Sequence, residues 1–355
     1  MDKKKEEIQK EIKEQILLSD YDYHLPEGLI GQTPTTPRDH SRLLVVDKTK
    51  KEIAHKKFYD ILDYLNKGDV LVRNSTKVIP ARLIGKKESG AVMEVFLLKR
   101  LKLNRWECLV RRAKKLKLDQ TIIFGDGQLK ATLKEVKDDG NRILEFTFDG
   151  VFEEIIHELG QMPLPPYITE KLEDGDRYQT VYAEKGESVA APTAGLHFTE
   201  ELFEKIAEKG VEIVDVYLEV GLGTFRPVQT ENVLEHKMHS ETFEVPEKTV
   251  EVVNRAKEEG RRIVAVGTTS VRTLESATDS CGKLIATSGD TEIFIYPGYE
   301  FKIVDALITN FHLPKSTLLM LVSALSEKDF IFDVYKEAVK EKYEFFSFGD
   351  AMFIY

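Results

Sequence analysis

The pattern of apolar residues changes along the chain, and this change restricts the folds that the chain can adopt. Between residues 69 and 150, short apolar runs are separated by turns such as Gly125-Asp126-Gly127. Many short strands at this spacing predict a small barrel or sandwich. After Val151, helical and extended patterns alternate, which indicates a layered α/β domain. We expect its strands at 211–219, 262–266, near 292–296 and 303–308, and at 343–347.

The first 68 residues contain a charged amphipathic pattern that predicts a helix over 2–17, an apolar strand, residues 43–47, and a helical pattern that ends near Gly68. A chain of 355 residues is long enough for two domains. We therefore predict a discontinuous α/β catalytic domain, residues 1–68 plus 151–355, with an all-β, barrel-like domain inserted at residues 69–150. In the insert we expect strands at 69–73, 77–86, 91–98, 106–111, 120–124, 128–136 and 142–148.

Positive charge is concentrated in the first half of the predicted insert. The whole chain carries a formal charge of −10, which on its own argues against a nucleic-acid partner. Residues 70–117, however, contain fourteen basic and three acidic side chains, a net charge of +11, which leaves −21 for the remainder. This basic segment predicts contact with RNA phosphates. The alternative is a solvated strand face, and we expect Trp106 to lie in the core.

Two cysteines are too few for a four-thiolate metal site or an iron–sulfur cluster held by three or four cysteines. No apolar run approaches the length of a membrane span, and the N-terminal residues lack the apolar core of a signal peptide. We therefore expect a cytoplasmic protein that does not contact a membrane.

Turns between a strand and a helix are candidate ligand sites, because backbone N–H groups and a helix dipole point toward anions there. The first is residues 216–225, in which an apolar strand ends at Glu219 and is followed by Gly221-Leu222-Gly223. It is similar to the S-adenosylmethionine loop of methyltransferases, although Phe225 replaces a third glycine. A tight turn without a ligand is the alternative.

The second turn, residues 264–272, places Arg272 in the first turn of a helix, where a positive charge opposes the helix dipole. This placement suggests either an anionic ligand or an internal carboxylate, and the alternative is an ordinary helix cap with a solvated arginine. A third turn, residues 309–317, contains His312 and opens an apolar helix, but it lacks the glycines of a nucleotide-triphosphate loop. A fourth, residues 191–199, places His197 before a helix that Thr199 is expected to cap. A lone histidine is more often structural than catalytic, but its near-neutral pKa makes it a candidate for proton transfer.

His236 and His239 are three residues apart beside acidic residues, a spacing that can share a metal ion. Lys237 lies between them and no third ligand is identifiable, so we predict no metal site.

Taken together and in order, several stretches resemble one family, the S-adenosylmethionine:tRNA ribosyltransferase-isomerases of queuosine biosynthesis. The resemblance covers nearly the whole chain. The matching stretches include residues 21–26, 78–83, 177–183, 191–199, 223–228, 266–272, 309–320 and 348–352. The sequence departs from the family at Ser75 and Lys77, where Asp and Arg are usual, and at Glu219, where His is usual.

The resemblance implies an α/β fold with an inserted β-barrel and the following reaction. The ribosyl moiety of S-adenosylmethionine moves to 7-aminomethyl-7-deazaguanine at the wobble position of tRNA and isomerises, giving epoxyqueuosine, adenine and methionine. S-adenosylmethionine is a consumed co-substrate, and we expect no metal, no iron–sulfur cluster and no other cofactor. We expect a monomer whose partners are this tRNA and S-adenosylmethionine.

The chemistry needs a base beside the sulfonium and a hydrogen-bond donor for the departing adenine. The candidates for proton transfer are His197, Glu219, His239 and His312. The candidates for substrate binding are Thr193, Gly195, Gly221, Gly223, Arg226, Thr268, Thr269, Arg272 and Asn310. The candidates for tRNA binding are Lys77, Arg82, Lys99, Arg100, Arg111, Arg112, Lys114, Lys115 and Lys117.

Two other functions remain open at this stage. A methyltransferase is supported by the Gly221-Leu222-Gly223 loop alone, and a non-catalytic RNA-binding protein by the basic segment alone.

Overall fold

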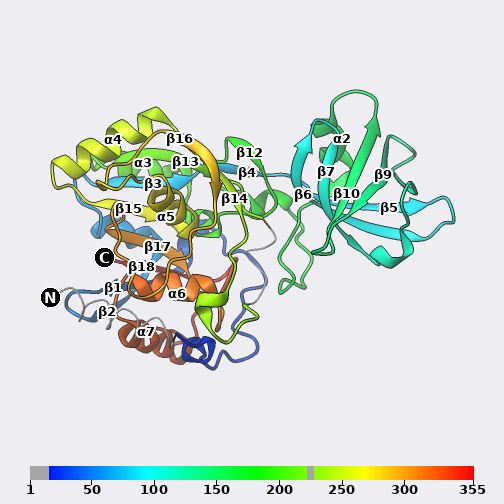
Figure 1. Ribbon diagram of the computed structural model, residues 1–355. Coiled ribbons are helices and arrows are strands. Elements are labelled where there is room, and N and C mark those ends of the chain that lie inside the picture. Colours follow the sequence, from blue (N-terminus) through cyan, green and yellow to red (C-terminus); the bar gives the residue numbers. More distant parts are fainter. Residues whose placement is uncertain (1–15, 222–227) are drawn as a thin grey trace, which may run out of the picture.

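The computed structural model describes residues 16–221 and 228–355 (Figure 1). The described strands form a large sheet, a barrel and a short pair. The large sheet has nine strands, in the spatial order β16 (Thr287–Thr291), β14 (Glu241–Val245), β13 (Glu212–Leu218), β3 (Val70–Asn74), β15 (Ile263–Val266), β17 (Ala306–Asn310), β18 (Ala351–Ile354), β1 (Arg42–Asp47) and β2 (Glu52–Lys57). Its centre is parallel, since β13, β3, β15 and β17 all run in one direction.

Helices cover both faces of this sheet. Alternate residues of a strand point to opposite faces, so Val70 and Val72 pack on one side and Leu71 on the other. The first side is covered by α4 (Glu247–Glu258), α5 (Gly267–Ser276), α6 (Thr317–Ala324) and α7 (Lys328–Lys340). The second is covered by α3 (Glu200–Glu208) and the 3-10 helices η3 (Phe58–Asp63) and η6 (Thr193–His197).

The barrel is closed because its first and last strands also pair with each other. Around the barrel the strands are β5 (Arg82–Lys87), β6 (Val92–Lys102), β7 (Arg105–Arg111), β10 (Arg142–Phe148), β9 (Leu129–Val136) and β8 (Thr121–Phe124). Helix α2 (Phe152–Leu159) packs on it, and the short β11 (Gly160–Gln161) extends β5. Trp106 is fully buried in the barrel core, as predicted.

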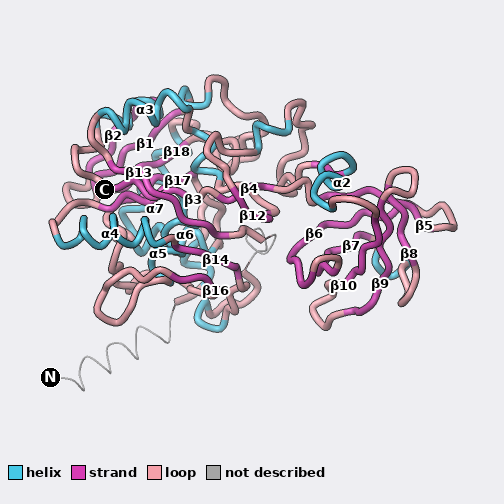
Figure 2. The backbone as a smooth tube through the Cα atoms, turned by 90° about the horizontal axis from the view of Figure 1, so that it is seen from above, coloured by secondary structure: helices cyan, strands magenta, loops and turns pink. Residues whose placement is uncertain are grey.

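The barrel forms a lobe of its own beside the larger α/β body (Figure 2). The predicted fold class, a layered α/β domain with an inserted all-β barrel, is confirmed. Two ion pairs of β6 join barrel and body: Lys99 with Asp290 at 3.3 Å, and Arg100 with Glu187 at 2.8 Å. The short pair consists of β4 (Thr76–Val78) and β12 (Lys185–Ser188). It lies where the chain passes between the lobes.

Three expected strands differ from the structure. Residues 69–73 were assigned to the insert, but they form β3 at the centre of the large sheet, where β13 and β15 flank the strand. Residues 343–347 and 292–296 form no strand. Tyr343 and Phe345 are apolar because they fill the core beside Phe311, not because they belong to a sheet. The remaining domain boundaries stay predictions, and the predicted helix at residues 2–17 falls almost entirely outside the described residues.

Candidate active site

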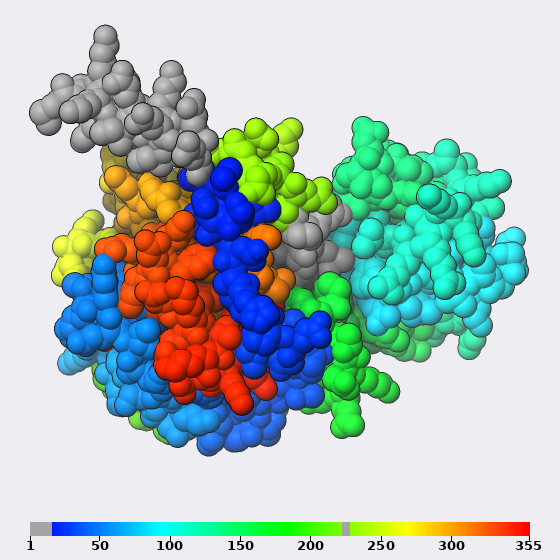
Figure 3. Space-filling model, turned by 90° about the horizontal axis from the view of Figure 1, so that it is seen from below, coloured from blue at the N-terminus to red at the C-terminus, as the bar shows by residue number. Residues whose placement is uncertain are grey.

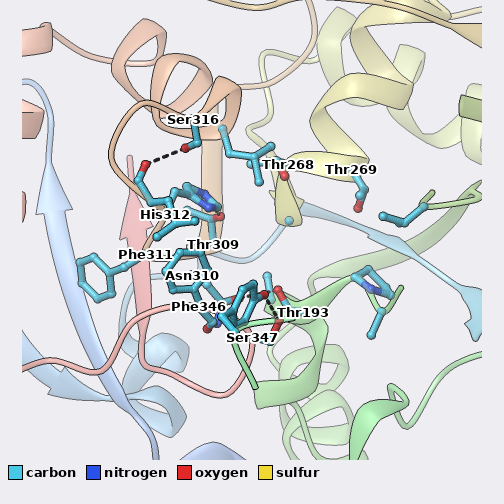
Figure 4. Close-up of a pocket in the computed structure, with 18 of the residues that line it drawn as sticks. Thr193, Thr268, Thr269, Thr309, Asn310, Phe311, His312, Ser316, Phe346 and Ser347 are labelled. Carbon is cyan, nitrogen blue, oxygen red and sulfur yellow. Dashed lines mark hydrogen bonds between the residues drawn. The ribbon is translucent and has the colours of Figure 1, made fainter. Parts of the chain in front are cut away.

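A cavity of about 430 Å³ opens at the carboxyl ends of β15 and β17, the edge at which open α/β sheets bind ligands. Its size is within the usual range for small-molecule sites. Figure 4 shows hydroxyl, amide and imidazole groups around it. The polar lining residues include Tyr167, Thr193, Thr268, Thr269, Thr309, Asn310, His312, Lys315, Ser316 and Ser347.

Helices α5 and α6 both begin at this cavity. Gly267 follows β15 directly and has φ of +82°, a backbone conformation that side chains rarely adopt, which lets the chain turn at once into α5. Ser316 caps α6 by accepting a hydrogen bond from the Leu319 N–H at 3.2 Å. Because the first N–H groups of a helix have no partner within it, both helix ends direct positive potential at the cavity.

The side chain of Asn310, the last residue of β17, is held by three neighbours in a fixed orientation. Its carboxamide nitrogen donates to the Phe346 carbonyl at 2.9 Å and contacts Nε2 of His197 at 3.1 Å. Its carboxamide oxygen accepts from the Thr193 hydroxyl at 3.2 Å. Since a carbonyl can only accept, the bond to Phe346 fixes which end of the amide carries the N–H groups.

This orientation fixes the tautomer of His197. Nε2 must accept from Asn310, so Nδ1 carries the proton and donates to the Ser41 hydroxyl at 2.7 Å. Burial, reinforced by the charge of Arg38, lowers the pKa of His197 to about 3, and its ring stacks on Phe58. His197 is therefore neutral, has both ring nitrogens engaged and lies behind Asn310 rather than on the wall of the cavity.

His312 lines the cavity itself. Its Nε2 and the Thr309 hydroxyl are 3.0 Å apart, and its backbone is held by the hydroxyls of Tyr23 and Tyr335. Burial lowers the pKa of His312 to about 3, so the imidazole is neutral near pH 7. Nδ1 has no hydrogen-bond partner within residues 16–221 and 228–355 and is the ring nitrogen left for a ligand.

Thr268 and Thr269 approach the cavity from the first turn of α5 (Figure 4). The Thr269 hydroxyl is buried and has no hydrogen-bond partner among the described residues. Because a buried polar group without a partner is costly, a hydroxyl left open in a cavity wall suits a bound ligand.

Sequence reasoning missed the aromatic side of the cavity. The rings of Tyr167 and Phe346 lie 4.5 Å apart, and the Tyr167 hydroxyl bonds that of Ser347 at 2.7 Å. Phe346 has φ of +72°, unusual for a bulky residue and frequent at functional sites. No local motif identifies Tyr167, because folding alone brings it to residues distant in the chain.

Arg272 is paired inside the protein. It is 4% exposed and forms an ion pair with the buried Glu241, which also contacts Nε2 of His239 at 3.2 Å and accepts from the Gly221 N–H at 3.1 Å. Burial alone would raise the pKa of Glu241, but the contacts with His239 and Arg272 outweigh burial and hold that pKa below its usual value. Of the two explanations for Arg272, the internal carboxylate is the one present, and Arg272 and His239 do not line the cavity.

The remaining predicted site residues lie in different places. Glu219 accepts from the Glu187 N–H at 3.3 Å and directly precedes Val220, which lines the cavity. Gly195 is buried behind the cavity wall, where a Cβ would collide with the Tyr182 hydroxyl. Gly223 and Arg226 lie outside the described residues, so their predicted roles stay untested.

Most predicted tRNA-binding residues are on the barrel surface, but they differ in their contacts. Arg82 and Arg111 both pair with Glu94, and Lys99 and Arg100 pair with the body. The others are exposed and have no ion pair among the described residues: Lys77, Arg112, Lys114, Lys115 and Lys117. These five cations are the ones available to phosphates.

Ser75, where the resemblance leads one to expect Asp, hydrogen-bonds Asp215, which also pairs with Arg73 at 2.7 Å. An acidic group therefore still lies at this position, supplied by the neighbouring strand. Within residues 16–221 and 228–355, no group of three His, Cys, Asp or Glu side chains is arranged to hold a metal ion. In the same residues, no helix combines the length and apolar character that crossing a membrane requires.

Comparisons with known proteins agree with the resemblance. The family model described as "Queuosine biosynthesis protein" matches residues 18–354. The S-adenosylmethionine:tRNA ribosyltransferase-isomerase of Fusobacterium nucleatum is 66% identical over 339 residues, which are 95% of this chain and 97% of that protein. The crystal structure of S-adenosylmethionine tRNA ribosyltransferase from Thermotoga maritima is 42% identical, with a TM-score of 0.55 over 95% of this chain and 100% of that one.

The family match extends over almost the whole chain, and the matched residues include both the barrel and the α/β body. The prediction of a transferase-isomerase enzyme is confirmed. The chain belongs to the queuosine biosynthesis protein family.

Proposed function

We propose that the enzyme transfers and isomerises the ribosyl moiety of S-adenosylmethionine onto 7-aminomethyl-7-deazaguanine at the tRNA wobble position. The products are epoxyqueuosine in tRNA, adenine and methionine. The observation that carries the proposal is the cavity at β15 and β17, whose polar lining comes largely from the motifs that resemble this family. The printed name of the Fusobacterium relative supports the same co-substrate and a tRNA acceptor.

The co-substrate has three polar parts that the cavity can bind. A carboxylate is attracted to the first turns of α5 and α6, where N–H groups and helix dipoles converge. The hydroxyls of Thr268 and Thr269 suit the ribose, and the rings of Tyr167 and Phe346 offer a surface for a purine. This assigns the methionine carboxylate to the helix N-termini rather than to Arg272, which Glu241 already neutralises.

Thr193 is the best-oriented acceptor in the cavity. Its hydroxyl proton is directed at Asn310, so its remaining lone pairs are available to a ligand. In the proposed reaction, this oxygen accepts a hydrogen bond from the ribose or from the attacking amine. Asn310, His197 and Ser41 position Thr193 and do not themselves transfer protons.

Proton transfer is assigned to His312 and Glu219. The reaction needs one proton removed beside the sulfonium, one removed from the attacking amine, and one delivered to adenine as its bond to C1′ breaks. Neutral His312, with Nδ1 free of protein partners in the described chain, can hydrogen-bond a leaving adenine or pass a proton. Glu219 is the carboxylate among the predicted site residues, and it directly precedes Val220 of the cavity wall.

The test is to incubate the protein with S-adenosylmethionine and tRNA that carries the modified base, and to identify the by-products. Adenine and methionine in equal amounts support the proposal. S-adenosylhomocysteine would indicate a methyltransferase instead, and tight tRNA binding without turnover would indicate a non-catalytic RNA-binding protein. The enzyme family already argues against both alternatives.

Cytoplasmic location, a monomeric state and the absence of any further cofactor remain predictions. Gel filtration and activity after exhaustive chelation test the last two directly.

A further inference from the structure

A second cavity, of about 790 Å³, lies outside the barrel, where β5, β6 and β7 meet the segment 161–175. This segment crosses the junction between the two lobes (Figure 3). None of the substrate roles proposed above occupies this cavity. We call it the junction cavity.

The barrel side of the junction cavity carries unusual side chains for an outward face. Met93, Val95 and Leu97 of β6 point into the barrel core, so Phe96 and Leu98 point outward. Arg82, Phe96 and Leu109 form one row across three neighbouring strands. An outward row of a barrel normally carries polar residues, but this one offers an apolar, aromatic surface.

Glu94 pairs with both arginines that line the cavity, whose charged lining also includes Glu170 and Lys171. Glu94 holds Arg82 at 2.6 Å and Arg111 at 3.0 Å, so two guanidinium groups are paired with the same carboxylate. The guanidinium carbon of Arg82 lies 6.0 Å from the centre of that ring. Fixed guanidinium planes next to an aromatic ring are what RNA-binding proteins use to stack an unpaired base. The carboxylate and the guanidinium groups also supply acceptors and donors for a base edge.

The junction cavity shares a wall with the active-site cavity. Within the segment 164–168, Tyr167 lines the active-site cavity, whereas Pro165, Pro166 and Ile168 line the junction cavity. A nucleotide in the first cavity and its chain neighbour in the second would therefore be separated by one stretch of backbone. The exposed cations Arg112, Lys114 and Lys115 follow directly after β7 and lie beyond Arg111.

We propose that the junction cavity binds one unstacked base of the tRNA anticodon loop, next to the nucleotide that is modified. The inference rests on the proposed function, because it takes tRNA as the acceptor. Phe96 stacks on the base, and Arg82 and Arg111 bind its edge or the adjoining phosphate. The site thereby holds the loop open while the wobble nucleotide enters the active-site cavity.

The experiment measures the dissociation constant of an anticodon stem-loop for the full-length protein at fixed salt. Phe96→Ala should weaken binding about tenfold, because stacking on one aromatic ring contributes on that scale, while Phe96→Tyr should bind like the unchanged protein. Leu98→Ala, inside the cavity, should also weaken binding. Leu103→Ala is the matched control and should not, because Leu103 is 76% exposed at the hairpin tip. Affinity for S-adenosylmethionine should not change, and thermal unfolding checks that each variant is folded.

A stem-loop that lacks the base next to the wobble nucleotide completes the test. For the unchanged protein, removing that base should weaken binding about as much as Phe96→Ala does, and the two changes together should cost little more than one. Equal binding by Phe96→Ala, or fully additive effects, would overturn the base site. If Phe96→Ala does not fold, Arg111→Gln on the exposed rim replaces it. Its effect on binding and the effect of removing the base should likewise combine to little more than one of them.

Failure of this inference differs from failure of the proposed function. If the unchanged protein releases adenine and methionine but Phe96→Ala binds the stem-loop normally, only the base site is wrong. If the unchanged protein binds the stem-loop but never releases adenine, the proposed function is wrong.

Discussion

The amide nitrogen of Asn310 lies 3.1 Å from Nε2 of His197, so both side chains are held in one orientation beside the cavity. His197 accepts there and donates from Nδ1 to Ser41. The chain of contacts from Ser41 through His197 and Asn310 ends at the Thr193 hydroxyl in the active-site cavity. Ser41, His197 and Asn310, which come from three separate parts of the sequence, thus orient the Thr193 hydroxyl.

The first prediction concerns the end of this chain of contacts. Thr193→Val keeps the shape of the side chain but removes the oxygen, so it should lower single-turnover adenine release about tenfold to hundredfold, the effect of losing one oriented hydrogen bond to the reacting groups. Thr193→Ser should retain most of the rate. Equal rates for the valine and serine variants would remove Thr193 from the reaction.

The second prediction separates support from proton transfer at His197. His197→Ala should reduce kcat by loosening Asn310, yet the pH dependence of the remaining activity between pH 6 and 8 should match that of the unchanged protein. The reason is that a histidine with a pKa of about 3 does not titrate in this range. If the variant loses an ionisation near neutral pH from its kcat profile, His197 takes part in proton transfer after all.

The third prediction is a stability difference in weak acid. His197 and His312 have folded pKa values of about 3, below the ordinary value of 6.5, so below pH 6.5 the unfolded state binds protons that the folded state does not. Their stabilising contribution is complete above pH 6.5 and falls as the pH drops toward 3, at about 1.4 kcal/mol per pH unit for each histidine. Between pH 6.5 and 5, the free energy of unfolding in urea should therefore fall less steeply for His312→Gln than for the unchanged protein. Equal slopes of unfolding free energy against pH would contradict a neutral, buried His312.

The fourth prediction concerns the buried ion pair between Arg272 and Glu241. Glu241→Gln leaves a buried guanidinium without its counter-charge and should lower the free energy of unfolding by about 3–5 kcal/mol. Glu212→Gln is the matched control, since its ion pairs with Arg255 and Arg261 are near the surface and should cost less than about 1 kcal/mol. If the two variants lose similar amounts of unfolding free energy in urea, the Arg272–Glu241 pair does not behave as a buried ion pair.

The fifth prediction places tRNA on the barrel. Charge reversal of Lys114, Lys115 and Lys117 to Glu should weaken tRNA binding and reduce the slope of log Kd against log salt, because fewer phosphates are neutralised. Lys336→Glu, an exposed residue of α7 on the body, is the control and should leave the slope unchanged. An unchanged slope for the barrel variants would move the tRNA site to the α/β body.

The sequence predicts best where a local pattern determines a local structure. Thr199 followed by two glutamates predicts the start of α3, and the Thr199 hydroxyl does accept from the Leu202 N–H at 3.1 Å. The switch from alternating to helical spacing near Val151 likewise predicts two architectures. The closed barrel and the helix-covered sheet follow from it.

Pairing between distant segments is what the sequence could not supply. The strand at residues 69–73 is apolar in either sheet, so its pattern does not reveal that β13 and β15 flank it. Arg272 looked available to an anion because Glu241 is far from it in the chain, and Tyr167 joins the active-site cavity only through folding. The structure brings residues of several candidate motifs to the cavity, but the sequence could not say which of their side chains face it.

The fate of the ribose carbons tests the central claim most directly. S-adenosylmethionine labelled with ¹³C in its ribose is incubated with the protein and tRNA that carries 7-aminomethyl-7-deazaguanine, and the tRNA nucleosides are then analysed by mass spectrometry. The account predicts that the whole labelled ribosyl unit appears in the modified nucleoside, with one adenine and one methionine released for each. Label that stays on a nucleoside by-product, or a methyl group found in the tRNA instead, would contradict it.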